Sequence, residues 1–197
     1  RYFGIKGHVY YYENTHSYRI DYCHRDISKF IYSKFGEYAE NKYIDNDFLN
    51  YPLEFQQGLL QGWLDGDGGN YVDRRDRTKI TGTTISKNLA LNMYSISLRL
   101  GLKPMIKYRG NRIWDVYFSS DDAIILSSNL SNKYTSPNKE YGHKSKRRII
   151  KKGDLKFIIS PITDINISVY NGPVYNLTTK NHVYIANYVL NHNCDPP

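Results

Sequence analysis

Apolar positions along the chain follow two different periods, and the change from one to the other marks successive elements. Near the start, Val9–Tyr22 is rich in aromatic and β-branched residues on both sides of Glu13–His16, which predicts a hairpin. Arg25–Tyr38 then places apolar residues near helical spacing, with Gly36 at its end. Asp45–Tyr51 is expected to be a polar connection to the next helix.

The middle of the chain predicts a helix and two strands, repeated once and closed by a further helix. Ser86 can cap the second helix because its hydroxyl can accept a hydrogen bond from a free backbone N–H, and Gly101 can end it. Arg109–Arg112 predicts a hairpin turn with a basic residue on each shoulder. The expected elements are, in order, a helix over Leu53–Gly69 with Pro52 in its first turn, strands over Asn70–Arg74 and Lys79–Thr84, a helix over Ser86–Leu100, strands over Met105–Tyr108 and Ile113–Phe118, and a helix over Asp121–Leu130.

The first of these helices has two unusual features. Glycine recurs every fourth residue at 58, 62 and 66, which leaves one face of the helix without side chains. Three such glycines cost about 2–3 kcal/mol in helix propensity, which close packing of a second helix would offset. Asp65 and Asp67 stand at the C-terminal end, where the helix dipole disfavours acids, so we expect a divalent cation shared across the interface. A calcium-binding EF-hand loop would need glycine where Asn70 stands.

The stretch Leu60–Gly68 reads Leu-Gln-Gly-Trp-Leu-Asp-Gly-Asp-Gly and resembles the nine-residue signature of the LAGLIDADG homing endonucleases. The resemblance implies an α+β fold, an αββαββα half with a saddle-shaped sheet. It also implies binding and cleavage of double-stranded DNA, with Asp67 as the Mg²⁺ ligand. Lys107 is our candidate for the basic residue that the family uses near the metal. The strands would lie in the major groove, with contacts from Arg74, Arg75, Arg77, Lys79, Lys107, Arg109 and Arg112; ordinary exposed strand charges are the alternative.

The last stretch, Val174–Cys194, alternates short β-prone runs with polar turns and ends in a group of reactive side chains. The Asn193 amide can attack its own backbone carbonyl, form a succinimide and cut the chain. Such a reaction needs an acid, for which His192 is placed, and a base, for which His182 is the candidate. Cys194 follows with a thiol that becomes a strong nucleophile once ionised.

This order of residues resembles the C-terminal splicing motifs of inteins, the self-excising protein segments with an all-β Hint fold. The resemblance implies that Asn193 is the last intein residue and that Cys194 opens the host segment, or extein, and accepts acyl transfer; no cofactor is needed. Asn176 stands where the family usually has Asp, and Tyr188 replaces a frequent glycine. The alternative is a LAGLIDADG DNA-binding module, or an inactive endonuclease scaffold, whose β tail is structural.

The two resemblances together predict five segments. These are the end of a first LAGLIDADG half (1–50), a second half (51–142), a basic linker (143–154), a C-terminal intein segment (155–193) and extein residues (194–197). An N-terminal splicing half and a first signature helix are missing from the sequence. We therefore expect the C-terminal portion of a longer precursor or of a split intein, whose partners are the N-terminal intein segment, the host extein and double-stranded DNA.

Composition changes this interpretation little. The net charge of +8 favours an acidic partner, but most of the excess lies in 143–157, where seven basic residues stand against Asp154. We interpret that stretch as a solvated linker. The two cysteines, Cys23 and Cys194, do not have zinc-site spacing, and a disulfide between them is possible but not implied. With neither a leader nor an apolar run of about 18 residues, we expect a cytoplasmic or nucleoid-associated protein without membrane contact.

Overall fold

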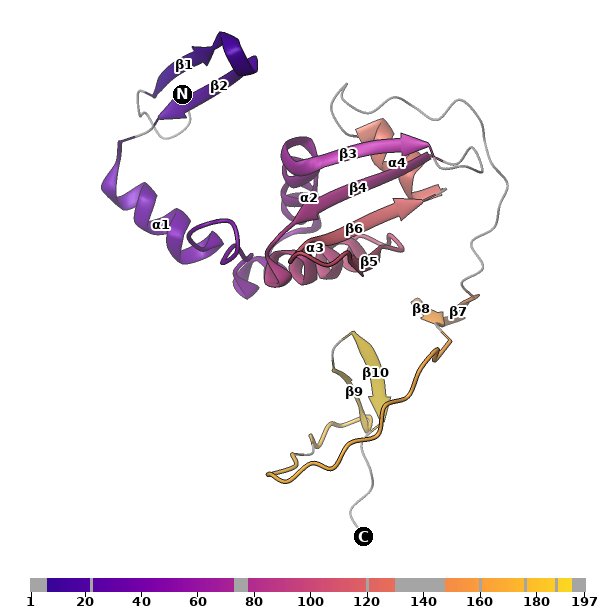
Figure 1. Ribbon diagram of the computed structural model, residues 1–197. Coiled ribbons are helices and arrows are strands. Elements are labelled where there is room, and N and C mark those ends of the chain that lie inside the picture. Colours follow the sequence, from indigo (N-terminus) through magenta and orange to yellow (C-terminus); the bar gives the residue numbers. More distant parts are fainter. Residues whose placement is uncertain are drawn as a thin grey trace. The chain divides into compact units, whose positions relative to one another are not determined.

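The computed structural model describes residues 7–21, 23–72, 78–119, 121–129, 148–159, 161–175, 177–186 and 188–192. The chain divides into two compact units, Arg1–His143 and Lys144–Pro197, which are described one at a time (Figure 1). The predicted Asn176, Asn193, Cys194, Arg74, Arg75 and Arg77, and all of 194–197, lie outside the described residues.

The first unit begins with the predicted hairpin and helix. Strand β1 (His8–Tyr12) pairs antiparallel with β2 (Ser17–Asp21), and the turn η1 (Glu13–Thr15) joins them. His16 completes the turn with a left-handed φ of 47°. Helix α1 (Arg25–Phe35) ends at Gly36, whose φ of 76° is readily accessible only to glycine. Both predictions are confirmed.

The connection between the first two α-helices is more ordered than its polar sequence suggests. It forms the 3₁₀ helix η2 (Asn46–Asn50), whose Phe48 is buried. Lys34 of α1 donates a hydrogen bond of 2.7 Å to Asp45 at the start of η2. This bond raises the pKa of Lys34 and lowers that of Asp45. The prediction of a plain polar connection therefore missed an element that anchors the end of α1.

The central elements follow the predicted helix-strand-strand repeat. They are α2 (Leu53–Asp67), β3 (Gly68–Val72), β4 (Thr78–Thr84), α3 (Lys87–Arg99), β5 (Met105–Tyr108), β6 (Trp114–Ser119) and α4 (Asp121–Asn129). The strands form one antiparallel sheet in the order β3-β4-β6-β5. Ser86 caps α3 by accepting a hydrogen bond from the Leu89 N–H at 3.2 Å. The αββαββα order, the cap and the α+β class are confirmed.

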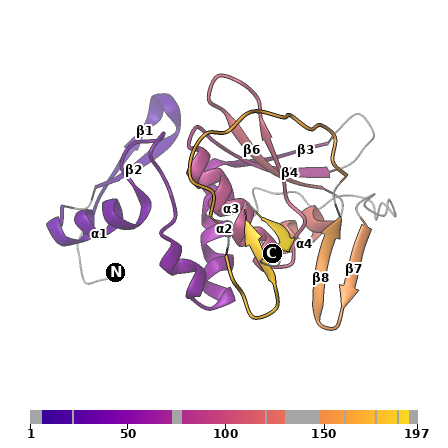
Figure 2. The same cartoon turned by 90° about the horizontal axis from the view of Figure 1, so that it is seen from below.

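The helices α2, α3 and α4 lie on one side of this sheet (Figures 1 and 2). Alternate strand residues, among them Ile80, Val116 and Phe118, are fully buried against them. Leu60 and Leu64 of α2 belong to the same hydrophobic core. Because successive strand residues point to opposite faces, the residues between these buried positions form the second face of the sheet, which no described helix covers; it is called the open face below.

The core also crosses residue 50, where the sequence suggested a boundary between two halves. Gln56 of α2 is fully buried, and its amide nitrogen donates to the carbonyl oxygens of Leu49 and Tyr51 at 3.1 and 2.8 Å. Its oxygen accepts from the Arg99 Nε at 3.0 Å. These bonds satisfy a buried amide, which would otherwise be costly, and they tie η2 to α2 and α3.

The described residues of the second unit form two hairpins and an irregular stretch between them. β7 (Arg148–Lys152) pairs with β8 (Leu155–Ile159), and β9 (Val183–Ala186) pairs with β10 (Val189–His192). The basic segment 143–154, which we expected to be a linker, contains the strand Arg148–Lys152. Residues 161–175 form neither helix nor strand, so the β-prone residues at the start of Val174–Cys194 are not part of a described strand. None of the side chains described in this unit is buried. No helix among the described residues is long and apolar enough to cross a membrane.

One glycine sets the distance between α2 and the sheet. A Cβ added at Gly82 of β4 would lie 2.3 Å from the ring of Trp63, which lies against it and is itself 8% exposed. Gly82→Ala is expected to lower the free energy of unfolding by about 1–3 kcal/mol, since the packed ring must move. Gly69→Ala on neighbouring β3 is the control, because its Cβ would meet nothing within 4 Å. Urea unfolding of both variants tests this, and equal stabilities would contradict it.

Candidate nucleic-acid interface

Helix α2 has one buried side and one bare side. Gln56, Leu60, Trp63 and Leu64 are its buried residues. On the other side, a Cβ added at glycine 58, 62 or 66 would meet nothing within 4 Å. Within the part of the chain that the structure describes, nothing therefore packs closely against the glycine face that the sequence predicted.

The bare side borders a hollow with an acid at one end. We call it the glycine hollow; it is lined by Phe35, Lys42, Tyr43, Ile44, Gly58, Leu59, Gly62, Trp63, Asp67, Leu89 and Met93. Most of its lining is apolar, so that a second helix could bury this surface. Asp67 offers carboxylate oxygens, which Mg²⁺ prefers. Among the described residues no group of three His, Cys, Asp or Glu side chains could hold a metal, so Asp67 would need ligands from elsewhere.

The open face of the sheet continues from the same end of α2. The pair Gly68–Gly82 comes directly after Asp67, and the next row along β4, β6 and β5 is Thr83, Asp115 and Lys107. Strands lie about 4.8 Å apart, which puts the Lys107 backbone in β5 about 14 Å from β3, the strand that begins directly after Asp67. Lys107 thus lies on the open face and is too far from Asp67 for direct contact within this chain, whereas the sequence-based hypothesis put it near the metal.

A polar cluster stands out on this face. The Asp115 carboxylate accepts from Arg109 Nε at 2.5 Å and from Arg109 Nη2 at 3.0 Å. It also accepts from the Thr83 hydroxyl at 2.9 Å. The Asp115 side chain is 11% exposed, whereas that of Arg109 is 49% exposed. We call these three residues the Arg109 fork.

Two further predicted basic residues also lie at the sheet surface. Lys79 faces Tyr71 across β3 and β4, with its ammonium 5.8 Å from the centre of that ring. Arg112 is exposed in the β5–β6 turn with a left-handed φ of 63°. The structure therefore brings Lys79, Lys107, Arg109 and Arg112 to one sheet and its connecting turn.

The sequence-based prediction missed Asp115 and Thr83. The predicted four-residue turn at Arg109–Arg112 would have placed Lys107 opposite Trp114. The observed loop is one residue shorter, with the Arg109 N–H bonded to the Ile113 carbonyl oxygen, and this shift of register puts Asp115 opposite Lys107. Thr83 needed the pairing of β4 with β6, two strands that a helix and a third strand separate in sequence. No local pattern carries that information.

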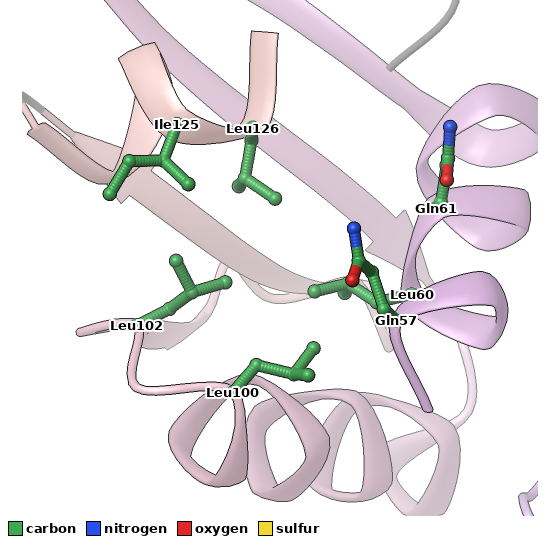
Figure 3. Close-up of a pocket in the computed structure, with 7 residues that line it drawn as sticks. All are labelled: Gln57, Leu60, Gln61, Leu100, Leu102, Ile125 and Leu126. Carbon is green, nitrogen blue, oxygen red and sulfur yellow. The ribbon is translucent and has the colours of Figure 1, made fainter. Parts of the chain in front are cut away.

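A second pocket lies between α2, the end of α3 and α4 (Figure 3). Five of its lining residues are aliphatic and two are glutamines: Leu60, Leu100, Leu102, Ile125, Leu126, Gln57 and Gln61. No titratable side chain lines it, so this pocket offers no group for acid–base or nucleophilic chemistry.

In the second unit, the two predicted histidines come together. The rings of His182 and His192 are stacked with centroids 6.1 Å apart and an angle of 19° between their planes. His192 pairs in register with Val183, the neighbour of His182. Tyr188, the residue in place of a frequent glycine, adopts a φ of 66°, so the turn has the backbone conformation that glycine favours.

Comparison with known proteins assigns the middle of the chain, from α2 in the first unit to just past β8 in the second, to a family. A family model described as a LAGLIDADG-like domain matches residues 54–162, more than half of the chain. The chain belongs to this family. The LAGLIDADG-like region begins within α2 and contains the whole four-stranded sheet. Among curated proteins, the uncharacterized protein MJ1054 of Methanocaldococcus jannaschii is 27% identical over 79% of this chain; the match covers 18% of that protein's length.

Substituting the glycines on the bare side of α2 should stabilise the isolated chain but weaken its pairing with a second helix. Gly58→Ala and Gly62→Ala should each raise the free energy of unfolding by about 0.5–1 kcal/mol, since alanine favours the helix and nothing obstructs the new methyl group. The same changes should weaken any close helix pairing across the glycine hollow. Chemical denaturation measures the first effect and sedimentation velocity with a LAGLIDADG partner half the second. Loss of stability in the isolated chain would contradict the prediction.

Proposed function

We propose that this chain binds double-stranded DNA across the open face of its sheet and supplies one half of a Mg²⁺-dependent endonuclease site. The family assignment of residues 54–162 is the observation that carries the proposal. The gathering of Lys79, Lys107, Arg109 and Arg112 at the open face and its turn supports it, because strands with basic side chains can enter the major groove.

The charge of the chain fits a polyanionic partner. Its net charge is +8, and the four basic residues above lie at the sheet away from the helices. Each phosphate neutralised releases counterions, so binding should weaken steeply with added salt. Tyr71, which is exposed next to Lys79, adds an aromatic surface to the same strand pair.

Asp67 is the residue that would hold the metal in this half. A bound Mg²⁺ would stabilise charge on the scissile phosphate. One carboxylate makes an incomplete site, and the glycine hollow leads from Asp67 along the bare side of α2. We propose that a second LAGLIDADG helix occupies the hollow and brings the second acid, either from another segment of a longer protein or from a second copy of this chain.

Binding and cutting can be separated by mutation. Lys107→Ala and Arg112→Ala should each reduce the slope of log affinity against log salt by about 0.9, the value for one phosphate contact. Asp67→Asn should leave this slope unchanged and abolish Mg²⁺-dependent cutting by the assembled halves. Fluorescence anisotropy with a random duplex measures the slope, and plasmid nicking measures the cutting.

Lys29→Ala is the control for charge alone, because Lys29 is exposed on α1 and lies off the sheet. If the Lys29 variant lost as much salt dependence as the other two, the open face would not be the binding surface. Cutting that persists with asparagine at position 67 would remove Asp67 from the metal site.

We propose protein splicing as a second function, for the second unit. The stacked His182 and His192 favour it, because His192 directly precedes Asn193 and the two imidazoles lie on one hairpin. In this proposal His182 and His192 assist the attack of the Asn193 amide nitrogen on its own carbonyl. The bond to Cys194 breaks, and the thiol of that residue has by then accepted the upstream segment. Asn176 would support the site in place of the usual aspartate.

The C-terminal residues allow a direct test by mass. Incubated with an N-terminal intein half that carries an upstream segment, the chain is expected to lose residues 194–197, which should appear joined to that segment. Asn193→Ala should stop release of this product, since alanine has no side-chain amide to cyclise. Asn191→Ala is the matched control, since its amide donates to the Val189 carbonyl oxygen at 2.7 Å within β10. If the chain stayed intact but still retarded duplex DNA in a gel, DNA binding would remain as its function and protein splicing would be excluded.

A further inference from the structure

The Arg109 fork is an unusual feature for a surface that binds a polyanion. A nearly buried carboxylate, Asp115, lies on the open face and pairs with one of its few basic residues. An arginine that served only to attract phosphates would lose much of its value in such a pair, because the carboxylate cancels its charge. Affinity for phosphates therefore does not explain why Arg109 is paired with Asp115.

The geometry of the fork provides one. Asp115 engages Nε and one N–H of Nη2, the side edge of the guanidinium. Arginine has five N–H donors in a fixed plane. The end edge, formed by Nη1 and the second N–H of Nη2, makes no hydrogen bond within the part of the chain that the structure describes. That edge is the one that matches the O6 and N7 acceptors of guanine in the major groove.

Thr83 and Asp115 also fix the orientation of the guanidinium. The Thr83 hydroxyl donates to the same carboxylate oxygen, Oδ1, that receives Arg109 Nη2. Thr83 comes from β4 and Asp115 from β6, so two neighbouring strands hold the side chain of Arg109, which directly follows β5. Holding it before binding lowers the entropy cost of ordering it against a base. A neutral base edge also tolerates the reduced charge better than a phosphate would.

We propose that Arg109 reads a guanine in the major groove and that Asp115, supported by Thr83, is its positioning residue. This inference rests on the proposed DNA binding and adds the base that is recognised. Lys107, opposite Asp115, and Arg112, in the turn, supply phosphate contacts that carry no sequence information.

The test is selection of preferred sites from a randomised duplex library by the full chain, followed by affinities for the selected site and for the site with its guanine replaced by adenine. The wild type should favour guanine at one position about tenfold or more. Arg109→Lys keeps the charge but loses the fork, and Asp115→Asn keeps the shape but loses the charge of the support. Both should bring this ratio close to unity. Asp115→Asn should bind random duplex as well as the wild type or better, because it removes a negative charge.

Matched variants separate this role from a structural one. Thr83→Val should reduce the guanine preference by less than Asp115→Asn, because it removes only the outer hydrogen bond. Arg112→Ala should weaken all sequences equally and keep the preference. Circular dichroism of every variant checks the fold, and a purely structural Asp115 would lower specific and random binding together, which would overturn the proposal.

The remaining outcomes are also decisive. A uniform loss of affinity in Arg109→Lys would assign Arg109 to a phosphate and overturn the reading of guanine. A wild type that selects a site whose profile neither variant changes would overturn the inference and leave the DNA-binding function in place. A wild type that binds no duplex would overturn that function and, with it, the inference.

Discussion

The two sides of α2 are the constraint on which the first unit depends. One side buries Leu60, Trp63 and Leu64 against the sheet, and the Trp63 ring fits only because β4 has Gly82 beneath it. The other side has no side chains to bury and leaves the glycine hollow uncovered in the described chain. The same helix therefore fixes the sheet, exposes a surface for a second helix and ends at Asp67. The glycines on one side lower the stability of the helix, and close packing of a partner helix against that side would offset this loss.

Position on the sheet then determines what each basic residue can do. The pleat sends Ile80, Val116 and Phe118 into the core and leaves Lys79, Lys107 and Asp115 on the open face. Register rather than sequence distance brings Thr83 within hydrogen-bonding distance of Asp115. A one-residue slip between β4 and β6 would turn Thr83 or Asp115 toward the core and break the hydrogen bonds of the Arg109 fork. The buried residues of the opposite face hold the register, so core packing and the polar cluster depend on each other.

Local sequence was enough for the order of elements in this unit. The signals for these elements act within a few residues and can therefore be recognised from the sequence. They are Ser86 as a cap, Gly36 and Gly101 at helix ends, and the change from helical to alternating apolar periods. The nine residues from Leu60 were enough to indicate the family. Local sequence was not enough where several elements meet: the Arg109 fork joins β4, β6 and the residue that follows β5, and η2 is fixed by Phe48 entering a core that the other elements build. A polar stretch with one aromatic residue gives no sign of this until that core exists.

In the second unit, local sequence was not enough to predict the strands, and the physical reason is different. The residues around Val174 have strand propensity, yet strands need partners for their backbone groups, and the described part of this unit provides two isolated hairpins. Many of its described apolar side chains are exposed, with Ile167 at 95% and Val169 at 100% exposure, although Phe157 and Ile158 are half-buried. Exposed β-branched residues in this number are typical of a surface that binds another protein segment. The splicing hypothesis also requires a partner for this unit, since the Cys194 thiol can accept an upstream segment only when an N-terminal intein half delivers it.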